Sequence, residues 1–160
     1  FMDLRGAQMS DHIHGKSLRH LIEGDECHHN ALLYGYFGKD VNFTDGHYTY
    51  CRQPQKNSIV HHHTAMPVNF SGFDAYEDLS NADMGSFLKS ANGIPHYRFS
   101  VSSKNHYNAP DFDPIYDIDI DPDQIHPLQD EKLEANLAKR MYDLLQAYDA
   151  PECQYARLGF

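Results

Sequence analysis

The sequence has few cysteines, few basic residues and no long apolar stretch, and each shortage excludes a class of protein. Three cysteines among 160 residues, Cys27, Cys51 and Cys153, are too few and too scattered for a disulfide framework. No C-x-x-C pair is present to hold zinc or to carry out redox chemistry. No stretch approaches the roughly 20 apolar residues of a membrane-spanning helix, and no signal peptide opens the chain. We therefore expect free thiols, a cytoplasmic location and no membrane partner.

Basic residues are outnumbered, with 13 Lys and Arg against 23 Asp and Glu, which gives a formal net charge of -10. No cluster of Lys and Arg offsets this charge, so a polyanion such as DNA would be repelled on average. We expect no nucleic-acid partner. The hydrophobic fraction of 41% and the charged fraction of 22% are those of a globular protein, and the length suits one core.

Apolar and aromatic runs separated by turn residues predict an antiparallel sheet. The run 31–38 is continuous and ends in glycine, which is typical of a central strand buried on both faces. Two further runs, 41–44 and 47–51, flank Asp45-Gly46, a dipeptide that favours a two-residue hairpin turn. Additional strands are predicted at 59–66, 97–101 and 115–120.

Helical spacing of apolar residues is clearest near the C-terminal end of the sequence. The residues at that spacing are Leu133, Leu137, Met141, Leu144, Leu145 and Tyr148. Asp130 would cap this long helix and Pro151 lies beyond its end. A shorter helix is predicted from an N-cap at Ser17 to Gly24, and one or two short helices are predicted within 74–91.

Together these elements predict an α+β fold, an antiparallel β-sheet of about four strands with a long C-terminal amphipathic helix packed on one face. Aromatic side chains are concentrated in the sheet: Tyr34, Tyr36, Phe37, Tyr48 and Tyr50. The second face would be a large apolar patch unless another domain or subunit packs there.

The 12 histidines raise the possibility of a metal site. His61 and His63 would point to the same side of a strand, as would His12 and His14 if their segment is extended. Zinc requires three or four ligands, so the histidine pair is better explained as a solvated or hydrogen-bonded strand face. We assign no metal ligand.

The aspartates at 117, 119, 121 and 123 alternate as at the start of a calcium-binding loop. The position that needs glycine is Pro122, however, and the position that needs a bidentate glutamate is Leu128. A strand with Ile118 and Ile120 facing inward, followed by a turn, explains the run better. The sequence also contains no G-x-S-x-G, P-loop or dinucleotide-binding glycine motif, so we assign no catalytic or cofactor-binding residue.

Five segments, in matching order and spacing, resemble the C-terminal part of bacterial sulfatases, members of the alkaline-phosphatase-like superfamily. They are Gly15-Lys16-Ser17-Leu18, Leu33-Tyr34-Gly35-Tyr36-Phe37-Gly38, Val41-Asn42-Phe43-Thr44-Asp45-Gly46-His47-Tyr48-Thr49-Tyr50, Ile115-Tyr116-Asp117-Ile118 with Asp121-Pro122, and Pro151-Glu152-Cys153-Gln154-Tyr155-Ala156-Arg157-Leu158-Gly159. The resemblance implies that residues 1–14 are the remnant of the last helix and linker of a catalytic domain. Residues 15–160 would form the C-terminal subdomain that packs on that domain.

Sulfatases hydrolyse sulfate esters with a formylglycine made from the Cys or Ser of a C/S-x-P-x-R motif, beside a divalent metal that is commonly calcium. The nearest segment here, Cys51-Arg52-Gln53-Pro54, has proline one position too late and no arginine after it. The resemblance therefore implies a non-catalytic part, inactive alone, whose nucleophile, metal and main partner belong to the missing N-terminal domain. The chain alone would form homo-oligomers. The alternative is a stand-alone histidine-rich binding module.

Overall fold

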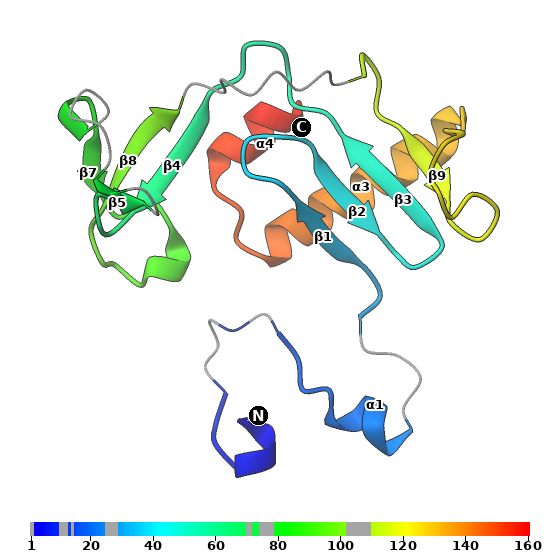
Figure 1. Cartoon of the computed structure of the whole chain (residues 1–160), viewed down its shortest axis with the longest axis horizontal. Helices are drawn as coiled ribbons and strands as arrows, with labels where there is room; N and C mark the ends of the chain where they lie inside the picture. The colour runs from blue at the N-terminus through cyan, green and yellow to red at the C-terminus, as the bar shows by residue number, and fades with distance from the viewer. Residues whose placement is uncertain are drawn as a thin grey trace.

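The computed structural model of the chain places two antiparallel sheets side by side, with a long helix across the larger one (Figure 1). It describes residues 2–9, 13, 15–24, 29–69, 72–73, 79–101 and 110–160. The larger sheet has the strand order β1-β2-β3-β9, the second has the order β4-β8-β7, and β5 pairs with β6. The strands are β1 Leu32–Gly35, β2 Val41–Thr44, β3 Tyr48–Arg52, β4 Val60–Thr64, β5 Val68–Asn69, β6 Gly72–Phe73, β7 Asp83–Gly85, β8 His96–Val101 and β9 Ile115–Asp117. The predicted α+β class is confirmed.

The long helix, α3 (Glu131–Ala147), begins where the sequence predicts. The Asp130 carboxylate accepts hydrogen bonds from the backbone N–H groups of Lys132 and Leu133, at 2.9 and 3.0 Å. These two donors have no partner inside the helix, so the cap stabilises its first turn. The helix ends at Ala147, and after Pro151 the chain forms a shorter helix, α4 (Glu152–Leu158).

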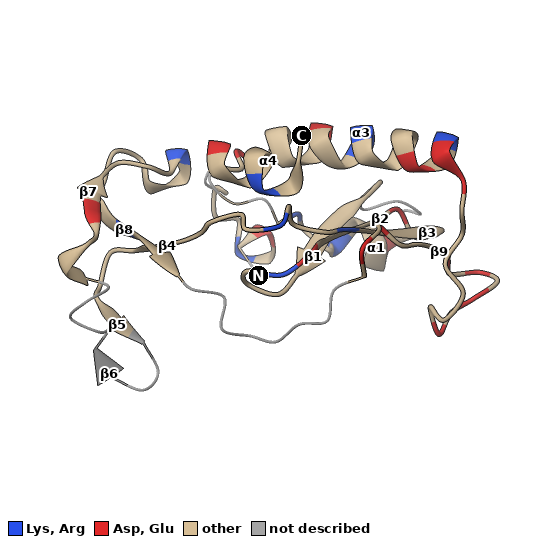
Figure 2. Cartoon of the chain, turned by 90° about the horizontal axis from the view of Figure 1, so that it is seen from above, with Lys and Arg blue, Asp and Glu red and all other residues tan. Residues whose placement is uncertain are grey.

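The core lies between the four-stranded sheet and these two helices. Phe43 pairs with Tyr50 and Tyr50 pairs with Ile115, so these side chains form one row on one face of the sheet. Leu137, Met141, Leu145 and Leu158 of the helices cover that row, and all seven residues are buried. Figure 2 shows both helices on the same side of the sheet. The predicted packing of the helix on one face is confirmed.

The run 31–38 is not a central strand buried on both faces. Only residues 32–35 form β1, and β1 is an edge strand. The strand ends at Gly35, which turns the chain back with φ +152. A Cβ at this position would lie 2.7 Å from the Asp40 carbonyl oxygen, so only glycine fits. The aromatic residues expected in the sheet therefore differ in burial. Tyr50 is buried and Tyr48 is partly buried on the helix side, whereas Tyr34, Tyr36 and Phe37 are 47, 81 and 64% exposed.

The hairpin between β2 and β3 is confirmed, with its turn one residue later than predicted. Thr44 pairs with Thr49, so Gly46 and His47 are the two central residues of the turn. Gly46 has φ +89, which suits the first central position of a tight hairpin turn. The Asp45 carboxylate accepts from the N–H groups of His47 and Tyr48 at 3.1 and 2.8 Å, which holds the turn closed.

The predicted strand 115–120 stops at Asp117. The Asp117 carboxylate accepts hydrogen bonds from the N–H groups of Asp119 and Ile120, and these bonds turn the chain out of the sheet. Ile118 is half-buried, but Ile120 is 83% exposed, so its predicted inward position is wrong.

The segments predicted at 59–66 and 97–101 are confirmed as β4 and β8, which pair with each other in the second sheet. Within the predicted helical region 74–91, residues 74–78, including Tyr76, lie outside the described residues. Met84 lies in strand β7 rather than in a helix, and Lys89–Ala91 forms one short 3-10 turn, η2. Leu79 and Ser80 are helical, so a helix is present in part of this region, and the apolar residues that follow it belong to a strand and a turn.

The N-terminal segment contains a 3-10 turn, η1 (Asp3–Arg5), and a short helix, α1 (Arg19–Glu23), which ends at Gly24 as predicted. Leu18 occupies the N-cap position, although the Ser17 hydroxyl accepts from the Arg19 N–H at 3.2 Å. Neither element contains a buried residue, and the segment lies apart from the sheets (Figure 1). Phe1, His12 and His14 lie outside the described residues. None of the described helices is both long and apolar enough to cross a membrane.

Candidate functional site

One face of the second sheet brings together histidines that are distant in sequence. His63 pairs with Arg98 across β4 and β8, and His96 pairs with Gly85 across β8 and β7. Because side chains alternate along a strand, His61, His63, His96 and Arg98 all lie on the same face, here called the histidine face. The predicted pair of His61 and His63 on one side of a strand is present, and the structure adds His96 to it.

The rings of the histidine face are close to one another. The ring centroids of His61 and His63 are 6.3 Å apart, and those of His63 and His96 are 5.7 Å apart. Phe87 contacts both His63 and His96, at centroid distances of 6.1 and 5.5 Å. His96 is only 5% exposed. The three imidazoles therefore form one cluster walled by an aromatic ring.

Charge at the histidine face is partly compensated. The Arg98 guanidinium forms an ion pair with the Asp83 carboxylate at 2.7 Å and lies 4.0 Å from the centre of the Phe87 ring. Burial lowers the pKa of His63, and the neighbouring imidazole of His96 lowers it further. His63 is therefore held in its neutral form more strongly than a solvated histidine.

Several polar atoms of this face are buried and have no hydrogen-bond partner among the described residues. They are Nδ1 of His61, Nε2 of His96 and Nε of Arg98. Buried polar atoms in native proteins are nearly always paired, so such atoms call for an explanation. The other nitrogen of His96, Nδ1, lies 3.1 Å from the Ile94 carbonyl oxygen. A carbonyl only accepts, so Nδ1 carries the proton and Nε2 presents a lone pair.

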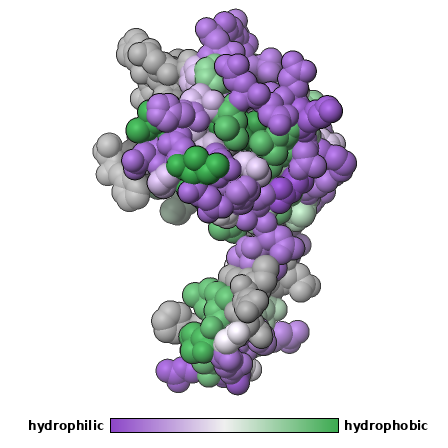
Figure 3. Space-filling model, turned by 90° about the vertical axis from the view of Figure 1, so that its right-hand side faces the viewer, coloured by the Kyte–Doolittle hydropathy of each residue, from purple (hydrophilic) through white to green (hydrophobic). Residues whose placement is uncertain are grey.

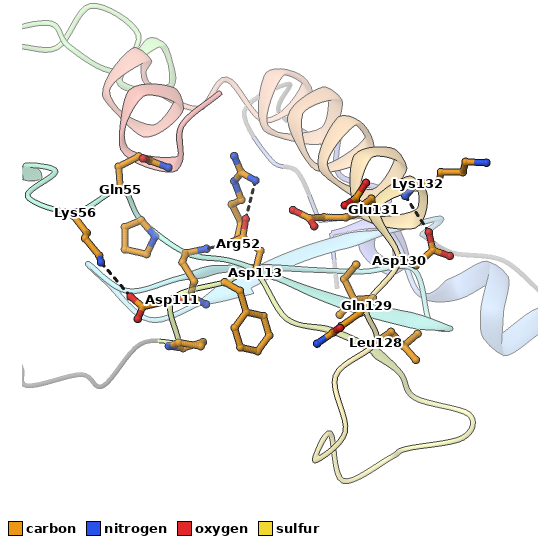
Figure 4. A pocket seen from close by; sticks show the side chains of 16 residues that line it. Arg52, Gln55, Lys56, Asp111, Asp113, Leu128, Gln129, Asp130, Glu131 and Lys132 are labelled. Carbon is orange, nitrogen blue, oxygen red and sulfur yellow. Dashed lines mark hydrogen bonds and ion pairs between the residues drawn. The ribbon is translucent and has the colours of Figure 1, made fainter.

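A groove of about 1410 Å³ lies between the end of β3, the segment 110–115 and the start of α3 (Figure 4). Arg52 and Asp113 form its base, with Nη1 of Arg52 2.7 Å from the Asp113 carboxylate. Arg52 also donates to the Tyr50 hydroxyl and to the carbonyl oxygens of Leu158 and Gly159. This guanidinium therefore holds the end of α4 against the sheet and is not available to bind a substrate anion.

Cys51 begins the segment nearest to a C/S-x-P-x-R motif, and its thiol is not activated. Burial, together with the nearby carboxylates of Asp40 and Asp113, raises the pKa of Cys51 to about 11. Burial also raises the pKa of Cys153. Both thiols are free and protonated at neutral pH, which disfavours nucleophilic attack. Cys27 lies outside the described residues.

His47, Asp117 and Asp119 form a second polar cluster, with one ligand atom of each within 4.8 Å of the others. His47 Nδ1 lies 2.5 Å from Asp119 Oδ2, and His47 Nε2 lies 3.7 Å from Asp117 Oδ2. The hydrogen bond with Asp119, together with the charge of Asp117, raises the pKa of His47. The cluster is explained as a surface ion pair between an imidazolium and two carboxylates. The pairing of β3 with β9 creates it, and the sequence did not suggest that pairing.

The aspartate run 117–123 also has structural roles. The Asp121 carboxylate accepts hydrogen bonds from the N–H groups of Ile125 and His126, at 2.8 and 2.7 Å. Like the Asp117 bonds described above, these bonds fix a turn.

No protein-family model, curated protein or solved structure matches the chain. The resemblance to sulfatases therefore depends on the sequence motifs alone. The structure places those motifs at the start of α1, in the strands β1 to β3, in β9 and in α4.

Proposed function

We propose that the chain is the non-catalytic C-terminal subdomain of a sulfatase-like hydrolase and that it packs on a larger catalytic domain. The order of the five sequence motifs supports this proposal, and so does the α+β architecture expected for such a subdomain. In the intact protein the subdomain would help to shape the substrate entrance for sulfate esters. The formylglycine and a divalent metal, commonly calcium, would belong to the catalytic domain.

The observation that carries the proposal is the amount of apolar surface that this chain leaves uncovered. In the N-terminal segment, large apolar side chains project from η1, α1 and the residues around them. Those at least 39% exposed are Met2, Leu4, Met9, Ile13, Leu18, Leu21 and Ile22. Figure 3 shows this segment as a lobe below the main body with apolar side chains on its surface. Such a surface is typical of a segment that packs on another domain.

The β1 side of the larger sheet has uncovered apolar side chains as well. Leu32 and Tyr34 lie on the face opposite α3 and are 45 and 47% exposed, and Tyr36 and Phe37 follow at the strand end. The helices α3 and α4 both lie on the other side of the sheet and leave this face uncovered (Figure 2). We propose that the catalytic domain covers both surfaces.

We also propose a cytoplasmic location. The free thiols of Cys51 and Cys153 support it, because unpaired cysteines are common in reducing compartments. Cys51 is partly buried in the larger sheet, where oxidation to a bulkier form would disturb the packing.

The proposal is tested by reading the coding DNA upstream of Phe1 and by assaying the isolated chain. We expect an in-frame segment that encodes a C/S-x-P-x-R motif and no hydrolysis of aryl sulfates above background by the chain alone. A start codon directly upstream, with no such motif, would contradict the family assignment. Turnover that persists after repurification would contradict the non-catalytic role.

A further inference from the structure

We propose that the outer edge of β1 pairs with β1 of a second copy of the chain, so that the larger sheets of the two copies join into one antiparallel sheet. Strand β1 lies at the margin of the larger sheet (Figure 1). The pairing uses the backbone edge of the strand rather than the outer face that a catalytic domain would cover. It therefore does not depend on the sulfatase-like role proposed above.

The hydrogen-bond pattern of the larger sheet shows which backbone groups of β1 face outward. Residues along an antiparallel strand bond alternately to the neighbouring strands on its two sides. The Cys51 N–H donates to the Pro114 carbonyl and the Ile118 N–H donates to the His47 carbonyl, both at 2.9 Å. The odd-numbered residues of β3 therefore bond toward β9, and the even-numbered ones bond toward β2.

The strand register carries this alternation to β1. The even-numbered residues of β3 pair with odd-numbered residues of β2, so the even-numbered residues of β2 bond toward β1, where they pair with Leu32 and Tyr34. Leu33 and Gly35 consequently direct their N–H and C=O groups away from the sheet. Among the described residues, no strand occupies this edge, and Leu32, Tyr34 and Gly35 are exposed. The unpaired backbone groups are therefore accessible.

Two copies of this edge match each other. When they run antiparallel about a two-fold axis at Leu33, the two Leu33 residues lie opposite each other and Ala31 lies opposite Gly35. All of these residues have outward backbone groups, so each N–H faces a C=O of the other copy. Leu32 then lies opposite Tyr34 of the other copy on the outer face, and apolar cross-strand pairs of this kind stabilise a sheet.

Charge favours this edge over the opposite one. The chain has a formal net charge of -10, but the segment 31–37 contains no charged residue, so two copies can meet there without facing carboxylates. The opposite edge, β9, leads into the aspartate run 117–123, and its Ile115 carbonyl already accepts from the Leu128 N–H at 2.7 Å. Charges and covering segments are the usual protection of edge strands, and β1 contains no charged residue and no proline.

Sedimentation equilibrium of two Leu33 variants tests the proposal. Leu33→Pro removes the outward N–H, and an edge strand tolerates proline where the missing N–H faces solvent, so the variant should fold. It should weaken self-association at least about 10-fold, because each copy loses a donor at the centre of the contact. Leu33→Ala truncates the side chain but keeps the N–H, so it should retain association. Far-UV circular dichroism checks the fold of both, and equal association constants for the two variants would overturn the proposal.

Amide hydrogen exchange of the wild-type chain provides a readout that needs no variant. The amides of Leu32 and Tyr34 bond within the sheet and should be protected at every concentration. The Leu33 amide should exchange at least about 10-fold more slowly in the concentrated, associated chain than in the dilute monomer. A Leu33 exchange rate that does not change with concentration would overturn the proposal. Neither result bears on the catalytic domain, whose presence is read from the coding DNA.

Discussion

At the scale of single residues, the polar side chains of the main body mostly hold backbone together. Arg52 binds the carbonyl oxygens of Leu158 and Gly159, and Nη1 of Arg157 donates to the Lys39 carbonyl at 2.8 Å. Both arginines connect the C-terminal helix to the sheet. Arg52, which lines the groove, donates four hydrogen bonds, to Tyr50, Asp113, Leu158 and Gly159.

The ion pair at His47 predicts a pH-dependent contribution to stability. Asp119 raises the pKa of His47 in the folded chain, so the folded state binds a proton more tightly than the unfolded state. The contribution is fully present below the unfolded pKa of about 6.5 and is lost as the pH rises through the higher folded pKa. In urea unfolding, His47→Gln should therefore destabilise the chain at about pH 5.5 and have less effect at about pH 8.5.

Asp119→Asn serves as the matched variant for this prediction. It removes the carboxylate that makes the 2.5 Å contact, so it should reduce the same pH-dependent difference. An effect of His47→Gln that stays constant with pH would show that the ion pair makes no contribution.

At the scale of elements, the start of α3 depends on one side chain. Asp130→Ala removes the acceptor for two N–H groups and should lower the free energy of unfolding by about 1 kcal/mol, the usual value of an N-cap. Asp130→Ser keeps a capping oxygen and should recover most of the loss. Urea unfolding measures both variants, and equal losses would show that the cap is not the cause.

The elements also show which features the sequence could predict. The α3 helix and the β2–β3 hairpin were predictable because their signals are local: a cap before a helical stripe, and a turn between two alternating runs. The apolar composition of 31–38 predicts a central, buried strand, but β1 lies at the edge of the sheet. The close approach of Gly35 to Asp40 ends the strand early. The division into two sheets depends on long-range pairing of β4 with β8, which no local pattern encodes.

The same limit applies to the candidate site. His61 and His63 were predictable as neighbours on one side of a strand because alternation is local. The contact of His63 with His96 depends on pairing between strands separated by a long segment of sequence. The ion pair of His47 with Asp117 and Asp119 likewise depends on the pairing of β3 with β9.

At the scale of the whole molecule, the described residues form a well-covered core beside uncovered apolar surfaces. The core is formed by the larger sheet, α3 and α4. The uncovered surfaces are the N-terminal segment and the β1 side of the sheet, where residues such as Ile22 and Tyr36 are 81% exposed. We propose that a partner covers these surfaces.

When the chain is isolated from a catalytic domain, we expect a second copy of the chain to cover these surfaces. Burial of apolar area contributes ~25 cal/mol per Å², so a patch of several hundred square ångströms would provide several kcal/mol toward pairing, before the entropy of association is subtracted. The formal net charge of -10 opposes association, and salt screens that repulsion. Closed symmetry then favours a dimer or a small oligomer.

Sedimentation equilibrium of the isolated chain across a series of salt concentrations tests the central claim, that these surfaces are packing interfaces. We predict a dimer or higher oligomer at micromolar concentration that becomes tighter as salt is raised, and that is weakened by Ile22→Glu or Tyr36→Glu. Ala135→Glu makes the same charge change at an exposed position of α3, away from both surfaces, so it is the control and should leave association in place. A chain that remains monomeric at every concentration and ionic strength would contradict the account.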